Sequence, residues 1–437
     1  MSFMISGYLQ SLLQKELERQ QNSLELIASE NYVSKQVMQA YANVFTNKYS
    51  EWYPGKRYYG GNEVVDELEL YTQQLALDIF GLDKQERWVN VQPLSGSVAN
   101  LAVYTGLLNP GDTILAMSLD AWWHLTHGYR LNASGKYFNF VHYGVDKDGY
   151  IDYGKLKALA IEHKPKLILA GFSSYPRTID REQFKIIKTM LASKHKHQTY
   201  LMADIAHIAW LIAWEVLQSP FQAGFDIITT TTHKTLRWPR GALVYYSKTK
   251  GEELGKQVNK WVFPGIQWWP FDHVLVAKAK AFEEILDPQT KWKDYCLNVI
   301  NNAQTLASEL SKLWRALVTW WTDNHLIVLD VTHKTIDGER TATGYTGKLA
   351  EKKMEEAGLS VSKQLLPSDP GPALNPSGIR IGTPAITTRW LQQADMITLA
   401  HIIDALLTDQ INLTNMPDKQ IVRDQVLQLC QTYPLSY

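Results

Sequence analysis

Short β-branched and apolar runs alternate with helix-like stretches along this chain, and this alternation constrains its fold more than any other feature. A strand, a helix and a second strand in succession form the repeating unit of a parallel sheet, so the pattern predicts an α/β fold. The predicted strands are Thr113–Met117, Lys166–Ala170, Tyr200–Ala203, Asp226–Thr230 and Ala242–Tyr246.

Polar residues follow three of these strands at the point where each strand should end. Ser173 follows the second strand, Asp204 the third, and a segment ending in Lys234 the fourth. Ligands of open α/β sheets bind at the carboxyl ends of the strands. The sequence therefore predicts a binding site at this edge of the sheet.

The pattern changes near Pro270, where longer helical stretches begin. We predict a helix over His273–Ile285, a strand over Leu326–Asp330, and helices over 346–357 and 391–408. The expected organisation is an N-terminal helical arm (1–22), a large domain with a mostly parallel sheet (23–280) and a smaller C-terminal α+β domain (281–437).

Composition excludes several classes of protein. The 437 residues are 45% apolar and carry no formal net charge, so neither nucleic acid nor an anionic membrane is an expected partner. The two cysteines, Cys296 and Cys430, exclude a disulfide framework and a cysteine-rich metal site, and we expect no metal. The chain has no signal-peptide core and no stretch of membrane-spanning length, so we expect a cytoplasmic protein.

Four features together predict a site for pyridoxal phosphate (PLP), a cofactor that acts as an electron sink. Lys234 ends a β-branched run and is suited to a Schiff base; the apolar strand before it argues against an ordinary surface lysine. Asp204 would keep the ring nitrogen protonated, although a helix N-cap is an equal interpretation. Ser95-Gly96-Ser97 opens a predicted helix whose N–H groups suit a phosphate. Arg380 would bind a carboxylate, or else form a structural ion pair.

Eight strings, in chain order, resemble the serine hydroxymethyltransferase family over nearly the whole length. They are LELIASEN (24–31), TNKYSEWYPGKRYYGG (46–61), VNVQPLSGSVAN (89–100), HLTHG (124–128), ADIAHIA (203–209), TTTTHKTLR (229–237), FPGIQ (263–267) and SGIRIGTPAITTR (377–389). The resemblance implies a PLP-dependent transferase of fold type I. It also implies transfer of the hydroxymethyl carbon of L-serine to tetrahydrofolate, the co-substrate, leaving glycine.

The resemblance also implies roles for individual residues. Lys234 would hold PLP, Asp204 would face its ring nitrogen, His207 would lie near the ring oxygen and His124 would stack on the ring. The other cofactor positions are Ser95, Gly96, Ser97 and Ser173.

Substrate positions follow from the same motifs. Arg380, assisted by Ser29, would bind the substrate carboxylate, and Leu119 and Leu125 would line the folate site. Glu51 would be the acid/base carboxylate, flanked by Tyr49 and Tyr59, and the family supplies these three across a dimer interface. A homodimer or a dimer of dimers is therefore expected.

Two alternatives remain open from the sequence. A PLP aldolase could cleave 3-hydroxy amino acids without folate, since that reaction needs the same lysine, aspartate and arginine. Glu51 and its surrounding string favour the folate enzyme. An inactive PLP-fold protein, used only for binding or assembly, is the second alternative, and the tryptophans encourage it.

Thirteen of the fifteen tryptophans stand where the family pattern has glycine; Trp261 and Trp292 are the exceptions. Glycine serves where φ is positive or where backbones approach closely. Overpacking costs about 1–3 kcal/mol per site, so thirteen such sites would exceed a stability of about 5–15 kcal/mol. The thirteen are Trp52, Trp88, Trp122, Trp123, Trp210, Trp214, Trp238, Trp268, Trp269, Trp314, Trp320, Trp321 and Trp390.

We hypothesise that these thirteen positions are glycines in the protein that the cell makes. In some genes the codon UGA encodes glycine. If such a gene is translated with a codon table that assigns UGA to tryptophan, the resulting sequence has Trp at these positions. Ordinary glycine codons would still print as Gly, which explains why Gly55 and Gly265 remain beside Trp52 and Trp268. The alternatives are aromatic drift and deliberate substitution.

Overall fold

The computed structural model describes residues 6–118, 122, 124–248, 252–313, 315–336, 339–367, 369, 372, 374–408 and 416–436. The chain forms two compact units: a large unit of residues 31–297, and a small unit of residues 1–30 and 298–437. These bounds differ from the expected ones at 22 and 280. One reason is that β1 (Leu24–Glu25) pairs with β12 (Leu359–Ser360), which makes the segment before residue 31 part of the small unit.

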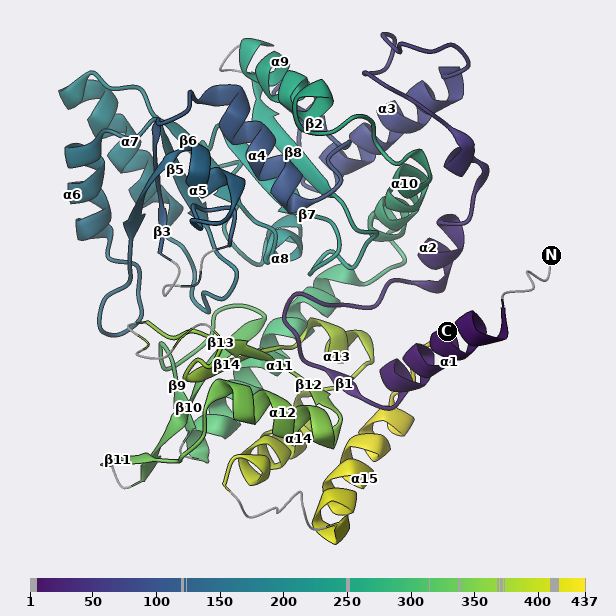
Figure 1. Ribbon diagram of the computed structural model, residues 1–437, viewed down its shortest axis with the longest axis vertical. Coiled ribbons are helices and arrows are strands. Elements are labelled where there is room, and N and C mark those ends of the chain that lie inside the picture. The colour runs from purple at the N-terminus through teal and green to yellow at the C-terminus, as the bar shows by residue number, and fades with distance from the viewer. Residues whose placement is uncertain are drawn as a thin grey trace. The chain divides into compact units, whose positions relative to one another are not determined.

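The large unit is built on a seven-stranded sheet with the order β2-β8-β7-β6-β5-β3-β4 (Figure 1). The five strands from β7 to β4 run parallel, whereas β8 pairs antiparallel with both β7 and β2. This confirms the predicted α/β fold with a mostly parallel sheet. The strands are β2 (Arg87–Asn90), β3 (Thr113–Met117), β4 (Asn139–Tyr143), β5 (Leu167–Gly171), β6 (Tyr200–Asp204), β7 (Ile227–Thr231) and β8 (Ala242–Ser247).

All five predicted strands are present, and β3 has the predicted bounds. Two strands of this sheet were not predicted, β2 and β4, and both lie at its edges. Edge strands are partly exposed and carry polar or large aromatic residues, such as Trp88 in β2 and His142 in β4. They therefore lack the continuous apolar run of a central strand.

Both faces of the sheet are buried. On one face the first helix after β2, α4 (Gly96–Leu107), and α9 (Glu252–Lys260) pack on residues such as Ile114 and Met202. The neighbouring residues Leu115 and Leu201 are equally buried. Burial on both faces explains why the central strands read as continuous apolar runs.

The remaining helices of the large unit include α10, which corresponds to the helix predicted over His273–Ile285. They are α2 (Lys35–Ala40), η1 (Val44–Asn47), α3 (Glu63–Asp78), α5 (Ala133–Tyr137), α6 (Tyr153–His163), α7 (Arg181–His195), α8 (Ala209–Ala213), η3 (Trp261–Ile266) and α10 (Asp272–Leu286). The long helix α11 (Trp292–Lys312) continues past residue 297, where the small unit begins.

The small unit contains an antiparallel sheet with the order β11-β10-β14-β13, in which β9 also pairs with β10. This is the predicted α+β arrangement, and the predicted strand at 326–330 is the first part of β10. The elements are β9 (Arg315–Leu317), β10 (Leu326–Ile336), β11 (Glu339–Ala342), β13 (Ser362–Gln364), β14 (Gly378–Gly382), α1 (Gly7–Gln21), α12 (Gly347–Ala357), α13 (Pro384–Thr388), α14 (Gln393–Leu406) and α15 (Met416–Thr432). Across the described residues, no helix combines the length and the apolar character needed to cross a membrane.

The backbone at several tryptophans has the conformation of glycine. Nine non-glycine residues among those described have a positive φ, and four of them are Trp52, Trp122, Trp320 and Trp390, with φ between 62° and 80°. A bulky residue is a genuine outlier there. The indole Nε1 groups of Trp210 and Trp214 are buried without a hydrogen-bond partner in the described part of the chain. These are the features that tryptophan at glycine positions would produce.

Candidate active site

The carboxyl ends of the parallel strands bring the predicted cofactor residues together. β6 ends at Asp204, β7 at Thr231, and Ser173 follows the end of β5. A pocket at this edge is lined by five predicted residues, together with four others. The predicted five are Gly96, His124, Ser173, Asp204 and Lys234, and the others are Asn100, Phe172, Ala206 and Thr231.

Asp204 is held as a carboxylate by its neighbours. One oxygen accepts hydrogen bonds from Asn100 Nδ2 (2.9 Å) and lies 3.2 Å from His127 Nε2, and the other accepts from the Ala206 N–H (3.1 Å). Burial acts to raise the pKa of Asp204, but the hydrogen bond and charge of His127, with His124 and Asn100, lower it well below its usual range. A buried anion at this position can keep a nearby ring nitrogen protonated.

His124 is kept neutral. Burial and the charges of His127 and Lys234 lower its pKa to about 4, and Asp204 only partly opposes them. Its Nδ1 lies 2.7 Å from Thr126 Oγ1, which fixes the orientation of the ring. A neutral imidazole that lines the pocket is suited to stacking on a flat, electron-poor ring.

The predicted phosphate turn begins α4. Ser95 is the N-cap, with its Oγ accepting from the Val98 N–H (3.3 Å), and Ser97 lies in the first turn. A Cβ at Gly96 would lie 2.7 Å from Thr231 Cγ2, so only glycine fits this position without a shift.

The pocket fits PLP in its chemistry. Thr231 Oγ1 lies in it, buried, with no hydrogen-bond partner among the described residues. The amine of Lys234, the anion of Asp204, an unpaired hydroxyl and a helix N-terminus are the groups that an aldehyde, a pyridinium and a phosphate require. His207 lies three residues after the end of β6 and is buried, but it does not line this pocket.

Arg380 and Ser29 belong to the small unit. Arg380 lies on β14 and is 9% exposed, and burial lowers its pKa to about 10. Ser29 lies in a turn beside the end of the same strand, because Gly382 packs closely on Ala28 and its N–H donates to Leu26 O (2.7 Å). Both residues therefore occupy the same part of the small unit.

Glu51 lies on the loop between η1 and α3, with Tyr49 and Tyr59 beside it. Glu51 is 9% exposed, and its Oε1 accepts from Trp268 Nε1 (2.5 Å). The rings of Tyr49 and Tyr59 are edge-on at 5.4 Å, and Tyr49 also packs on Trp269 at 4.1 Å. The three predicted residues thus lie together, but none of them lines the pocket that contains Lys234.

Of the two leucines predicted for a folate site, Leu125 is 52% exposed. It immediately follows His124, which places it next to the pocket. Leu119 lies outside the described residues.

The residues that hold Asp204 were not predicted from the sequence. His127 received no role, and Asn100 was not considered, although it joins three segments. Its Nδ2 also donates to Thr126 Oγ1 (2.9 Å), and its Oδ1 accepts from Thr229 Oγ1 (2.7 Å). The position of Asn100 in the sequence could have indicated its role, because it lies one turn after Ser97 on the helix that begins at the phosphate turn. In the sheet, its partner Thr229 pairs with Asp204.

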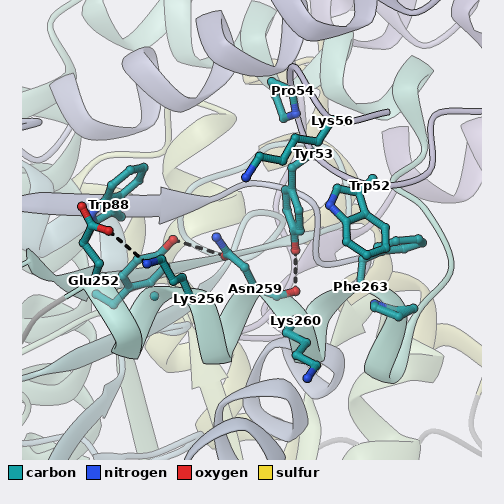
Figure 2. Close-up of a pocket in the computed structure, with 13 residues that line it drawn as sticks. Trp52, Tyr53, Pro54, Lys56, Trp88, Glu252, Lys256, Asn259, Lys260 and Phe263 are labelled. Carbon is teal, nitrogen blue, oxygen red and sulfur yellow. Dashed lines mark hydrogen bonds and ion pairs between the residues drawn. The ribbon is translucent and has the colours of Figure 1, made fainter. Parts of the chain in front are cut away.

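A larger pocket lies elsewhere in the large unit, with a volume of about 520 Å³. It lies between the loop that carries Trp52 and Lys56 and the helix α9, with Phe263 and Trp88 among its walls (Figure 2). None of the predicted site residues lines it. Two of its walls, Trp52 and Trp88, are among the thirteen tryptophans at family glycine positions, so its shape depends on their identity.

Comparisons with known proteins agree with this chemistry. Residues 5–403 match the family model for serine hydroxymethyltransferase. The serine hydroxymethyltransferase of Cyanothece sp. strain PCC 7425 is 45% identical over 426 residues, which cover 97% of this chain and 93% of the relative.

Proposed function

The chain belongs to the serine hydroxymethyltransferase family and transfers the hydroxymethyl carbon of L-serine to tetrahydrofolate, and we propose that Lys234, Asp204 and Glu51 carry this reaction. It is a PLP-dependent enzyme, and its products are glycine and 5,10-methylenetetrahydrofolate. The observation that carries the residue assignment is the common pocket of Lys234 and Asp204 at the ends of β7 and β6.

The pocket of Lys234 and Asp204 supports the following proposed roles for the cofactor residues. Bound PLP supplies an electron sink for the bond-breaking step. Lys234 would provide the amine that holds the cofactor, and Asp204, beside His127, would hold a proton on the ring nitrogen. The N–H groups at Ser95, Gly96 and Ser97 would bind the phosphate, and His124 would stack on the ring. Ser173, which lines the same pocket, would contact the cofactor. His207, three residues after the end of β6, is proposed to lie near the ring oxygen.

Arg380 is proposed to bind the substrate carboxylate, with Ser29 as a second donor. A buried guanidinium pairs strongly with a carboxylate because its two parallel N–H groups match the two oxygens. Burial lowers the pKa of Arg380 to about 10, and the negative charge of a bound carboxylate would act in the opposite direction by favouring the charged guanidinium.

Glu51 is proposed to move the proton of the serine hydroxyl, with Tyr49 and Tyr59 beside it and Leu119 and Leu125 lining the folate site. Since the pocket of Lys234 is not lined by Glu51 or either tyrosine, we propose that these groups serve the pocket of a second copy. The functional unit is then a homodimer, alone or paired into a dimer of dimers. We further propose that it works in the cytoplasm.

The residue assignment is tested with Lys234→Ala and Asp204→Asn, with Lys155→Ala on the exposed face of α6 as the control. Lys234→Ala should abolish the visible absorbance of lysine-bound PLP. Asp204→Asn should lower tetrahydrofolate-dependent serine turnover by at least about a hundredfold while the enzyme stays folded. Turnover that stays within a few-fold of the unsubstituted enzyme in either variant would refute the assignment, and equal serine cleavage without tetrahydrofolate would favour a folate-independent aldolase.

A further inference from the structure

A second buried carboxylate, Glu69 on α3, has no place in the reaction proposed above. Its side chain is fully buried. It accepts from Arg57 Nη2 at 2.7 Å, from Gln92 Nε2 at 3.0 Å on both oxygens, and from Gln73 Nε2 at 3.3 Å. A buried carboxylate with this many donors organises the groups around it.

The two principal donors of Glu69 also hold the backbone on both sides of Glu51. Arg57 Nη1 donates to Ser50 O (2.9 Å) and to Trp52 O (2.6 Å). Gln92 Nε2 donates to the same Trp52 O at 3.0 Å. These acceptors are carbonyl groups, so the arrangement is the same whether position 52 is tryptophan or glycine.

Asp66, three residues before Glu69 on α3, strengthens the same contacts. It accepts from Arg57 Nε (2.7 Å) and from the Gly55 N–H (2.7 Å). Asp66 and Glu69, both on α3, therefore fix the orientation of the Arg57 guanidinium through its Nε and Nη2. A planar guanidinium held at three nitrogens has little freedom to turn.

We propose that Glu69 is a positioning residue for Glu51: by orienting Arg57 and Gln92, it fixes the carbonyl groups of the residues before and after the proposed acid/base. Gln92 also precedes the phosphate turn, and Gln267 bridges Gln92 O (2.9 Å) and the Leu94 N–H (3.1 Å). Glu69 thus connects the loop of Glu51 with the start of the cofactor cradle. This inference rests on the role proposed for Glu51.

The negative charge of Glu69 is needed for this function. Burial raises the pKa of Glu69, and the charge and hydrogen bonds of Arg57 oppose that change. Glutamine has one acceptor oxygen, and its NH₂ group would face the N–H donors of Arg57 or Gln92. Glu69→Gln therefore keeps the shape of the side chain but weakens its hydrogen bonds with Arg57 and Gln92.

The test uses the PLP-loaded enzyme with Glu69→Gln, Glu51→Gln and the double variant. The matched control is Asp226→Asn: this carboxylate is equally buried in the large unit, and it binds Lys188 Nζ (2.5 Å) and the Leu201 N–H (2.8 Å) at the opposite end of β7. Glu69→Gln should lower kcat by about tenfold to a hundredfold, as a small misplacement of a reacting group does. The KM for serine and the visible spectrum should change little.

Hydrogen exchange supplies a readout that does not depend on turnover. Amides of residues 51–58 should exchange faster in Glu69→Gln, with or without PLP, but not in Asp226→Asn. In the Glu51→Gln background Glu69→Gln should cause no further loss of kcat. An unchanged kcat, a loss that multiplies that of Glu51→Gln, or the same loss in Asp226→Asn would each overturn the inference.

Two further arms keep the outcomes distinct. If Glu69→Gln does not fold, Arg57→Lys tests the same set of contacts. Lysine keeps the positive charge, but its single ammonium group cannot bind two backbone carbonyls and two carboxylates at once, as the Arg57 guanidinium does. If Glu51→Gln retains full kcat, the proposed function of Glu51 fails, while the exchange of residues 51–58 still decides whether Glu69 holds the loop.

Discussion

The charge state of single residues decides what the pocket can do. Asp204 is ionised because His127 and Asn100 supply donors to a carboxylate that burial alone would neutralise. His124 is neutral at physiological pH because burial and two neighbouring charges lower its pKa to about 4. The pocket therefore holds a fixed anion and a neutral aromatic ring side by side.

Stability should depend on pH through His124 and His233. Burial and nearby positive charges lower the pKa of both to about 4, below the ordinary value of about 6.5. Between pH 6.5 and 4 the unfolded chain binds more protons than the folded one, so stability should fall as pH falls through this window, by on the order of 2 kcal/mol per histidine. Urea unfolding at a series of pH values measures the slope.

The control for this prediction is His233→Asn against His401→Asn. His401 is exposed on α14, so its replacement should leave the slope unchanged. His233→Asn should reduce the slope. Equal slopes in the two variants would contradict the assignment of this pH dependence to His233.

Tryptophans at glycine positions should also lower the stability of the chain. Trp320 and Trp390 are 73% and 72% exposed with positive φ, so replacing each with glycine should raise the free energy of unfolding by about 1 kcal/mol, the cost of a left-handed residue. Trp268→Gly should also free the Glu51 carboxylate from the indole N–H. Chemical unfolding measures the first effect, and serine turnover measures the second.

Trp292→Gly is the matched control, since the family has no glycine there. Trp292 Nε1 donates to Glu284 O (2.8 Å) and its ring packs on Trp210 at 4.8 Å, so this change should destabilise. Intact mass of the protein from its native host tests the origin of the residues. A mass that matches fifteen tryptophans would refute the hypothesis of recoded glycines.

At the scale of elements, Arg389 joins the ends of two helices in the small unit. This buried guanidinium donates to Gln20 O and Gln21 O at the end of α1, and to Cys430 O and Tyr433 O at the end of α15. The last carbonyls of a helix lack partners within it and carry partial negative charge. One arginine therefore satisfies the carboxyl ends of two helices that are far apart in the sequence.

Arg389→Lys should release α1 first. Lysine offers a single ammonium group, so several buried carbonyls lose their donors, at a cost of about 1–3 kcal/mol for each group left unpaired. Hydrogen exchange and limited proteolysis of α1 measure the loss. Arg19→Lys, at a half-exposed side chain on α1, should change neither, and equal protection in both variants would show that Arg389 is not the link.

The whole molecule is proposed to work as a dimer in which each pocket takes Lys234 from one chain and Glu51 from another. Lys234→Ala and Glu51→Gln should each be inactive alone. Mixing them under conditions that exchange subunits should restore about a quarter of the activity, because half of the dimers are mixed and each mixed dimer has one intact site. Activity that stays at the sum of the two separate variants would place both residues in the same chain.

The central strands and the polar residues at their ends could be predicted from the sequence, because both follow from the pattern of apolar runs. The central strands read as apolar runs since both of their faces are buried, and Lys234, Asp204 and Ser173 were found because they follow such runs. The edge strands β2 and β4 were missed since partial exposure removes that signal. Arg380 could be predicted to bind a carboxylate, which stays a prediction, but its burial could not be predicted because it depends on the strands that flank it.

The fold class and the cofactor chemistry could be predicted from the sequence alone, since both depend on local patterns and on residues that directly follow strands. Only the tertiary structure revealed that Asn100 and His127 hold Asp204, and that Glu69 holds the loop of Glu51. Glu69 is one of several acidic residues in α3 and reads as part of a solvated face. Its burial and its partners come from segments that are close only in the folded chain, because hydrogen bonds depend on distances between atoms and not on separation along the sequence.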